Sequence, residues 1–456
     1  MVDQIRIIVE HFVDGNLTEQ TIIVNKEIGK VSSISELGFN HQQQMDLIKA
    51  CQDALLKIQS QDLQSDIQFC PKCGAKLKLA GHALSHFHAV LSDHKVSVKR
   101  KKCCNNKCGW TSVPSISSLF NTNVHPDLSK LQTEMACNHT YREAQNILNA
   151  ISYYPRKINN HEHIYRTIEI VGNYISAHQI NEIPDDISPV EELICQVDGG
   201  HLKAKEEGSR SFEALACVIY APQNVTYSDK NESTILKDDD ILRGKILSKH
   251  CAASALDDNQ ESIKRQTLVA ALKQGMTIET HITALCDGAN NCWNVVDSLE
   301  EQCHSITRIV DWFHIAMRFK NISLSKELAE KLNRLKWCIW HGMADEGLSR
   351  FDEIIAQASV DKMKERLTKL QSYLGNNKNY LVNYSERYKT GKVISSSLAE
   401  STIESLINKR CKGKQHMKWS REGAHPLLQI RASCASNDWL IFGANYVLNA
   451  TTQIAA

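Results

Sequence analysis

The chain carries almost no excess of charge of either sign. Its 456 residues include 53 Lys and Arg against 52 Asp and Glu, which gives a formal net charge of +1. A large positive charge is what draws a protein nonspecifically to nucleic acid or to an acidic membrane. The composition therefore gives no sign of a polyanionic partner, and local clusters of cations must carry that inference.

Long apolar runs are absent as well. None reaches the roughly 18 residues that a membrane-spanning helix needs, and the start, Met1-Val-Asp-Gln, lacks the basic and apolar segments of a secretory signal. We therefore expect a cytoplasmic protein that does not enter a membrane. Sixteen cysteines in such a chain favour reduced thiols and a metal site over a disulfide framework.

Two pairs of cysteines have the spacing of a metal site. Cys70-Pro-Lys-Cys73-Gly is followed by Cys103-Cys104-Asn-Asn-Lys-Cys108-Gly, and residues 86–100 between them alternate like a pair of strands. A glycine after each pair permits the tight turn that points two thiolates at one ion. The pattern predicts a zinc ribbon with one structural Zn²⁺, with Cys104 as an alternative to Cys103. The competing interpretation is a set of scattered buried thiols.

The segments around these cysteines show simpler patterns. Residues 5–25 alternate around Asp14-Gly15-Asn16, which predicts a hairpin, and residues 42–61 have helical spacing. Residues 128–175 are helical by period, with a capping box at Thr140-Tyr-Arg-Glu143. These later helices predict either a helix-turn-helix that contacts DNA or an all-helical linker.

Two apolar runs end at an aspartate. Leu-Ile-Cys-Gln-Val stops at Asp198-Gly-Gly, and Ile-Thr-Ala-Leu-Cys stops at Asp287-Gly. Each run predicts a buried strand that delivers its aspartate to the strand end. A turn aspartate is the simpler interpretation of Asp198. If a third acid joins the two, their oxygen atoms form the kind of pocket that Mg²⁺ prefers.

The order of the elements after residue 190 indicates a fold. Strands are predicted at 193–200, 212–221, 245–250, 282–289 and 306–310, with helices at 261–274 and 291–303. Three strands, a helix, a strand, a helix and a strand is the order of an RNase H-like core, where the first and fourth strands are neighbours. A helical block at 320–389 then delays a closing helix around Glu400 and Glu404.

Two basic segments, Lys95–Lys102 and Lys409–Arg421, are candidates for contacts to DNA phosphates. Trp419 fits a core position better than a base-stacking one. The candidate DNA-binding residues are Lys99, Arg100, Lys101, Lys409, Arg410, Lys412, Lys414, Lys418 and Arg421.

Over residues 65–440 the sequence resembles bacterial insertion-sequence transposases of the DDE type, the Kra-type group and its relatives. The resemblance rests on Val197-Asp-Gly, Cys286-Asp-Gly-Ala, Asp311-Trp-Phe-His314 and a C-terminal block. That block reads Ala-Glu400-Ser, Lys409-Arg410, Met417-Lys-Trp-Ser, Glu422-Gly-Ala and Leu428-x-x-Arg431. One departure is Ser395-Ser-Ser, where relatives often carry a glycine-bearing turn.

The resemblance implies an enzyme that cleaves the ends of a mobile element and joins them to target DNA. Asp198 would bridge two Mg²⁺ or Mn²⁺ ions, Asp287 would bind one ion, and Glu400 the other, with Glu404 as the alternative to Glu400. Terminal repeats and target DNA would be the partners of a nucleoid-associated homo-oligomer. A non-catalytic DNA-binding descendant and another RNase H-like nuclease are the alternatives. Asp311 fits a helix cap beside a packed His314 better than a catalytic role.

The fold expected is therefore a multidomain α+β chain: a zinc ribbon and a helical DNA-binding segment, then an RNase H-like α/β core with an all-helical insertion. The expected segments are an adaptor at 1–65, the ribbon at 66–115, the helical segment at 120–188, the core at 189–318, the insertion at 319–392 and the closing helix with its basic segment at 393–445.

Overall fold

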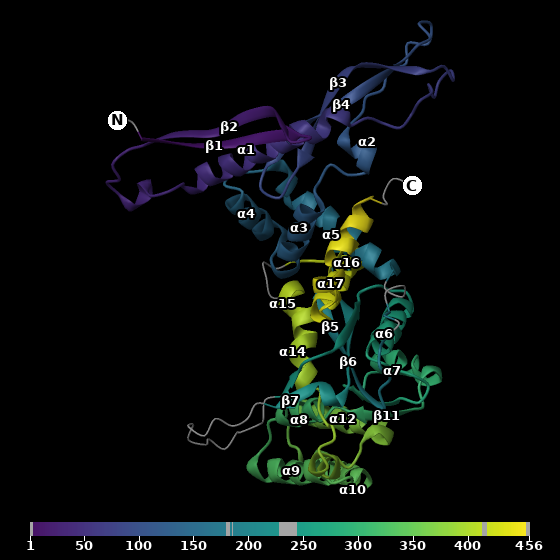
Figure 1. The fold of residues 1–456 in the computed structure, drawn as a ribbon. Helices are drawn as coiled ribbons and strands as arrows, with labels where there is room; N and C mark the ends of the chain where they lie inside the picture. The colour runs from purple at the N-terminus through teal and green to yellow at the C-terminus, as the bar shows by residue number, and fades with distance from the viewer. Residues whose placement is uncertain (1–2, 179–182, 185, 228–243, 413–416, 453–456) are drawn as a thin grey trace. The chain divides into compact units, whose positions relative to one another are not determined.

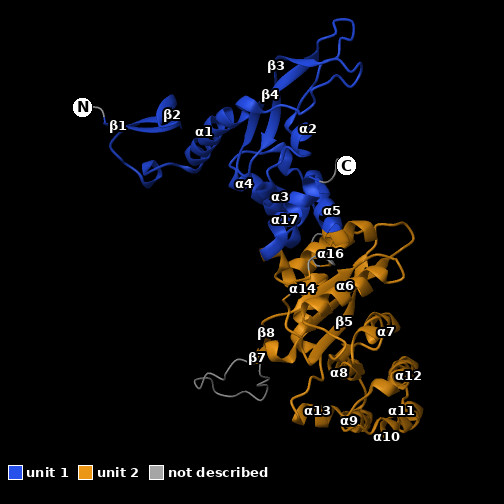
Figure 2. Cartoon of the chain, turned by 45° about the vertical axis from the view of Figure 1, so that its right-hand side comes forward, with its two compact units in different colours: residues 1–174, 441–456 blue, residues 175–440 orange. Residues whose placement is uncertain are grey.

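The computed structural model describes residues 3–178, 183–184, 186–227, 244–412 and 417–452 (Figure 1). The chain forms two compact units, residues 1–174 with 441–456 and residues 175–440 (Figure 2). Both combine helices and strands, as the α+β expectation requires. In the described part of the chain, no helix has both the length and the apolar character that crossing a membrane requires.

The first unit begins with a long hairpin. Strand β1 (Asp3–Val13) pairs antiparallel with β2 (Asn16–Ile28), and helix α1 (His41–Gln59) follows. The turn residues Asp14 and Gly15 have φ values of 51° and 80°, the left-handed conformation that a two-residue hairpin turn needs. The predicted hairpin and helix are confirmed.

A second antiparallel pair carries the cysteines, and helices follow it. The strands are β3 (Leu77–His88) and β4 (Asp93–Cys103). The helices are α2 (Ile116–Phe120), α3 (Pro126–Asn138), α4 (Tyr141–Ile151), α5 (His161–His178) and, from the end of the chain, α17 (Asp438–Thr452). The capping box at Thr140 and Glu143 is present at the start of α4.

The second unit is built on a mixed sheet of five strands in the order β11-β10-β5-β6-β9. Strands β5, β10 and β11 are parallel, and β6 and β9 are antiparallel to their neighbours. Their bounds are β5 (Glu192–Lys203), β6 (Ser211–Tyr220), β9 (His250–Ser254), β10 (His281–Cys286) and β11 (Ser305–Val310). The first and fourth strands are neighbours, as predicted.

Two strands have boundaries that differ from the predicted ones. Strand β5 does not stop at Asp198 but continues to Lys203, because its second half pairs with β6 after the pairing with β10 has ended at Val197. The strand predicted at 245–250 is two elements. Its first part, β8 (Gly244–Ile246), pairs with β7 (Val225–Tyr227) outside the sheet, and the third sheet strand begins only at His250.

Helices surround this sheet and follow it. Helices α6 (Glu261–Lys273) and α7 (Asn290–Asp297) lie between the strands in sequence, and α7 is shorter than predicted. The later helices are α8 (Trp312–Lys320), α9 (Lys326–Trp340), α10 (Ala344–Ser349), α11 (Phe351–Gln357), α12 (Asp361–Asn376), α13 (Tyr384–Lys389), α14 (Ser397–Leu406), α15 (Asn408–Cys411) and α16 (Arg421–Ala435).

The helical block is a true insertion because its two ends meet. The amide of Trp312, directly after β11, donates to the carbonyl of Ile394, directly before α14, over 3.1 Å. The chain thus leaves the sheet after β11 and returns to the same place some eighty residues later. As a result α14 begins beside the end of β11.

Candidate functional sites

The four predicted cysteines come together in the first unit. The sulfur atoms of Cys70, Cys73, Cys103 and Cys108 all lie within 4.8 Å of one another. Cys70 Sγ is 3.7 Å from Cys108 Sγ, and Cys73 Sγ is 3.4 Å from Cys103 Sγ. Cys104 is exposed and lies outside the group, so Cys103 is the member from that pair. Four converging sulfurs could hold one structural zinc ion.

Backbone turns aim these sulfurs. The amide of Gly74 donates to the carbonyl of Cys70 over 2.8 Å, and Gly74 and Gly109 have φ values of 71° and 65°. A residue with a Cβ atom rarely adopts that conformation, which explains the glycine after each cysteine pair. The backbone amide of Ala75, with the neighbouring thiols, lowers the pKa of Cys73 to about 7, whereas burial raises the pKa of Cys103.

In the second unit, three aspartates follow residues that pair with one another on three adjacent parallel strands. Val197 of β5 pairs with Cys286 of β10, and Cys286 pairs with Val310 of β11. The next residue in each chain segment is an aspartate: Asp198, Asp287 and Asp311. Because parallel strands in register present corresponding residues at the same edge, one row of acids follows from the pairing alone.

Asp198 and Asp287 each accept a hydrogen bond from a backbone amide close in the sequence. Oδ1 of Asp198 accepts from the amide of Gly199 over 2.8 Å, and Oδ1 of Asp287 accepts from the amide of Ala289 over 2.9 Å. The Tyr373 hydroxyl donates to the carbonyl of Asp287 over 2.7 Å and so fixes the backbone there. These local bonds orient both side chains without an ion pair to a lysine or arginine among the described residues.

The Asp311 side chain has a structural role, because its hydrogen bonds hold the starts of two helices. Its side chain is 1% exposed and caps α8 through the amide of Phe313, and Oδ2 lies 3.0 Å from Nδ1 of His314. It also accepts from the amide of Ser396 over 3.1 Å and from the Ser396 hydroxyl. The expected helix cap beside His314 is confirmed. Through Ser396, Asp311 additionally fixes the start of α14.

The third candidate acid is in the first turn of α14. Glu400 is half-buried, whereas Glu404, one turn later, is exposed. Burial raises the pKa of Glu400, and the charges of Asp311 and Asp198 raise it further against the opposing effect of His314. Glu400 is therefore near enough to Asp198 for the two carboxylates to interact.

Sequence reasoning missed a fourth acid, Glu213 on β6. Burial raises the pKa of Glu213, and the charges of Asp287 and Asp198 add to the rise. Its Oε2 accepts from the side-chain amide of Asn291 over 2.6 Å. An acid inside the apolar strand Phe-Glu-Ala-Leu-Ala-Cys was the available signal, since a carboxylate is rarely kept there without a partner or a role.

These acids make an electronegative site. Burial raises the pKa of Asp198 more than His314 and the Gly199 amide lower it, and the charges of Asp287 and Asp311 add a smaller rise. Among the described residues, the cysteine cluster is the one group of potential ligands whose atoms all lie within 4.8 Å; the carboxylates are spread more widely. The acids therefore feel one another's charge without forming a closed metal cage.

The predicted cationic residues fall into two sets. Lys409, Lys412 and Lys418 are exposed, and Arg100 is half-buried, whereas Lys414 lies outside the described residues. The others have partners: Lys99 pairs with Asp62 over 2.8 Å, Lys101 donates to the carbonyls of Ser65 and Ile67, and Arg421 donates to the carbonyl of Ala255 over 3.0 Å.

Arg410 does not fit the expectation of a phosphate contact in this conformation. Its side chain is 1% exposed, and its guanidinium lies 5.4 Å from the ring centre of Trp419, which is itself buried. The indole nitrogen of Trp419 donates to the carbonyl of Cys411 over 3.2 Å. Trp419 is thus a core residue, as expected, and Arg410 packs against it.

Comparisons with known proteins add little. No protein-family model matches the chain, and no curated protein matches it. Among solved structures, the chain is similar to the Drosophila P element transposase strand transfer complex, with a TM-score of 0.28 and 9% sequence identity over 67% of this chain and 91% of that chain. A TM-score this low carries no argument, so any inference about function must come from the residues described above.

Proposed function

We propose that this protein is a DDE-type DNA transposase, which cleaves the ends of an insertion sequence and transfers the strands to target DNA. The observation that carries the proposal is the register of the sheet. Asp198 and Asp287 directly follow the last paired residues of β5 and β10, Val197 and Cys286, and Glu400 is close enough to interact with Asp198. Acids from three separate segments lie near one another, and the simpler interpretation of Asp198 as a turn residue does not account for this grouping.

The arrangement of the sheet supports an RNase H-like core. The first and fourth strands, β5 and β10, are neighbours in the order β11-β10-β5-β6-β9, as expected from the sequence for that fold, and β5, β10 and β11 are parallel. The insertion leaves and re-enters at Trp312 and Ile394, so α14 closes the core after it. The remaining segments keep their proposed roles: residues 66–115 as zinc ribbon and 120–188 as a helical DNA-binding segment.

The donor chemistry of the acidic site fits hard divalent cations. Asp198, Asp287 and Glu400 offer only carboxylate oxygens. Burial raises the pKa values of Asp198 and Glu400 although His314 lowers both, and bound cations would offset the cost of burying these charges. Asp198, Asp287 and Glu400 would be the residues that hold two Mg²⁺ or Mn²⁺ ions. When bound, such ions activate a water or a 3′-hydroxyl and stabilise the leaving oxygen of a phosphodiester.

The chain's own residues then have separate tasks. Asp311 and the Ser396 that it binds hold the first turn of α14, which sets the position of Glu400. Exposed Lys409, Lys412 and Lys418 offer positive charge to DNA phosphates. The partners proposed are the element's terminal repeats and target DNA, with a homo-oligomer assembled on them.

The test uses the purified full chain and DNA that carries the inverted repeats flanking its gene. The expected result is strand cleavage at the repeat ends and joining to a target, lost in Asp198→Asn and Asp287→Asn while DNA binding remains. Cleavage without joining would indicate another RNase H-like nuclease. Binding without cleavage by the unaltered protein would indicate a non-catalytic descendant.

A further inference from the structure

A second feature of the sheet-and-helix unit lies on the far side of Tyr373 from the acids. Helices α8 and α12 enclose a pocket of about 340 Å³ lined by Arg318, Asn321, Ile322, Arg366, Lys369 and Leu370. Three of the six lining residues are cationic, and none is an acid. The floor is apolar, since Leu370 is 4% exposed, while the cationic side chains are exposed.

The cations are available to a ligand. Lys369 has one surface ion pair, to Glu365 over 2.5 Å, and both partners are largely exposed, so this bond is weak and exchangeable. A guanidinium nitrogen of Arg366 donates to the carbonyl of Asn321 at 3.5 Å, which joins the two helices across the pocket but does not neutralise the charge. An anion entering here would meet three positive charges.

Arg318 is held in place for such a ligand. Its guanidinium carbon lies 3.9 Å from the ring centre of Tyr373, in the stacked geometry of a cation–π contact. A stacked guanidinium is already ordered, so it loses little freedom when it binds a phosphate. The same tyrosine donates its hydroxyl to the carbonyl of Asp287 over 2.7 Å. One side chain therefore contacts both an arginine that lines the pocket and the backbone of Asp287.

We propose that Arg318, Arg366 and Lys369 form a subsite for a backbone phosphate of the DNA strand that crosses the acidic site. This inference rests on the proposed function for the identity of the strand. Acids that bind metal cannot attract DNA by themselves, so cations must hold the phosphates on either side of the reacting one. A strand advances roughly 3.4 Å per nucleotide, so a pocket one tyrosine away receives a phosphate within a few nucleotides of the cleaved bond.

The helical insertion thus gains a role that its sequence did not suggest. The block contributes two of the three cations from α12, and α8 supplies Arg318 directly after the Asp311 cap. Tyr373, also on α12, fixes both the arginine and the Asp287 backbone.

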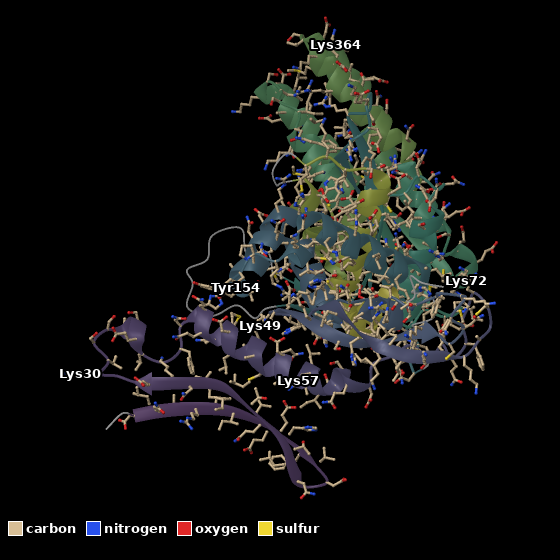
Figure 3. All side chains as sticks on the ribbon, turned by 90° about the horizontal axis from the view of Figure 1, so that it is seen from above. Lys30, Lys49, Lys57, Lys72, Tyr154 and Lys364 are labelled. Atoms are coloured by element: carbon tan, nitrogen blue, oxygen red, sulfur yellow. The ribbon has the colours of Figure 1, made fainter. Side chains whose placement is uncertain are left out.

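The experiment measures how DNA binding by the full chain depends on salt. A labelled DNA duplex is the probe, and Arg366→Gln is compared with Lys364→Gln. Lys364 is an exposed residue of the same helix, α12, that does not line the pocket (Figure 3), so its replacement removes one positive charge outside the proposed subsite. Arg366→Gln should lower the slope of log affinity against log salt by about 0.9, and adding Lys369→Gln should lower it by about 0.9 more. Lys364→Gln should leave the slope unchanged.

Equal slopes for Arg366→Gln and Lys364→Gln would overturn the subsite. Asp198→Asn distinguishes failure of the pocket proposal from failure of the proposed function, because it alters the proposed cleavage site and leaves the pocket residues unchanged. If the unaltered protein fails to cleave but Arg366→Gln still lowers the slope, the pocket stands and the transposase proposal fails. If cleavage occurs but the slopes do not differ, the transposase proposal stands and the pocket fails.

Discussion

A Cβ atom on Gly199 would lie 2.2 Å from Oε1 of Glu213, so the missing side chain at residue 199 makes room for that carboxylate. Gly200 has a different neighbour, since a Cβ atom there would lie 2.7 Å from Cγ2 of Ile407 at the end of α14. The two glycines after Asp198 therefore leave room for two neighbours: the carboxylate of Glu213 on β6 and Ile407 at the end of the helix that carries Glu400.

Acids that are buried and lie close together should destabilise the metal-free protein at neutral pH, with burial as the larger cause. A carboxyl whose pKa is raised by folding binds its proton more tightly in the folded state, so stability falls as pH rises from the ordinary carboxyl range through the raised pKa of Asp198. Asp198→Asn should raise the melting temperature at pH 7 by roughly 2–4 °C, the effect of about 1 kcal/mol in a domain of this size. Below roughly pH 4 the gain should vanish, because both states are then protonated.

The control for this prediction is Glu404→Gln, which removes an exposed acid from the same helix as Glu400 and should leave the melting temperature unchanged. Adding Mg²⁺ should stabilise the unaltered protein and stabilise Asp198→Asn much less, because a ligand that binds only the folded state raises its stability. A lower melting temperature for Asp198→Asn at pH 7 without metal would show that burial and crowding of the acids are not the dominant effect.

The two glutamates of α14 should differ in cleavage. Glu400→Gln is expected to reduce cleavage of repeat-end DNA by more than about 100-fold with either Mg²⁺ or Mn²⁺, because it removes a proposed ligand beside Asp198. Glu404→Gln should cost less than about 10-fold, as expected for a group that acts at most through a neighbour. The reverse order would assign the role to Glu404, after a shift of the helix by one turn.

The cysteine cluster should bind about one zinc ion per chain in reduced, unchelated protein. Cys70→Ser should lose that zinc and weaken DNA binding through local unfolding, while circular dichroism and melting of the second unit stay close to those of the unaltered protein. Cys104→Ser is the matched control, because Cys104 is exposed and outside the cluster, and it should keep the metal. Protein purified without any zinc would contradict the assignment.

Exposed lysines of the C-terminal basic segment should contribute to the salt dependence of DNA binding. Replacing Lys409 and Lys412 by Gln should lower the slope of log affinity against log salt by about 1.8, or about 0.9 for each lost phosphate contact. Lys326→Gln, an exposed lysine at the start of α9, should have no such effect. An unchanged slope in the double variant would mean that both lysines face solvent in the complex.

Several elements were predictable because local pattern and tertiary context agree. The Asp14-Gly15 hairpin, the capping box of α4, the cysteine pairs and the strand before Asp287 all have short-range signals that the structure confirms. The continuation of β5 was not predictable from Asp198-Gly-Gly, because a glycine pair that normally marks a turn here serves close packing.

The direction in which side chains point could not be predicted from the sequence either. Spacing alone placed Arg410 among the DNA-binding cations, but its contact with Trp419 turns it inward. Likewise, no linear signal links Arg318 to Arg366, since the pocket that they share arises from packing of α8 against α12. Glu213 could have been suspected from its apolar strand, but its nearness to Asp198 depends on the pairing of β5 with β6.

The insertion between β11 and α14 also sets the order in which the acids are synthesised. Glu400 follows Asp198 by about 200 residues, so a ribosome that adds roughly 5–20 residues per second reaches it some 10–40 s later. The first unit is also incomplete until residues 441–456 emerge. A nascent chain that has finished the five strands therefore has neither its full acidic site nor its complete first unit, and a transcript cut short before α14 yields a protein without Glu400.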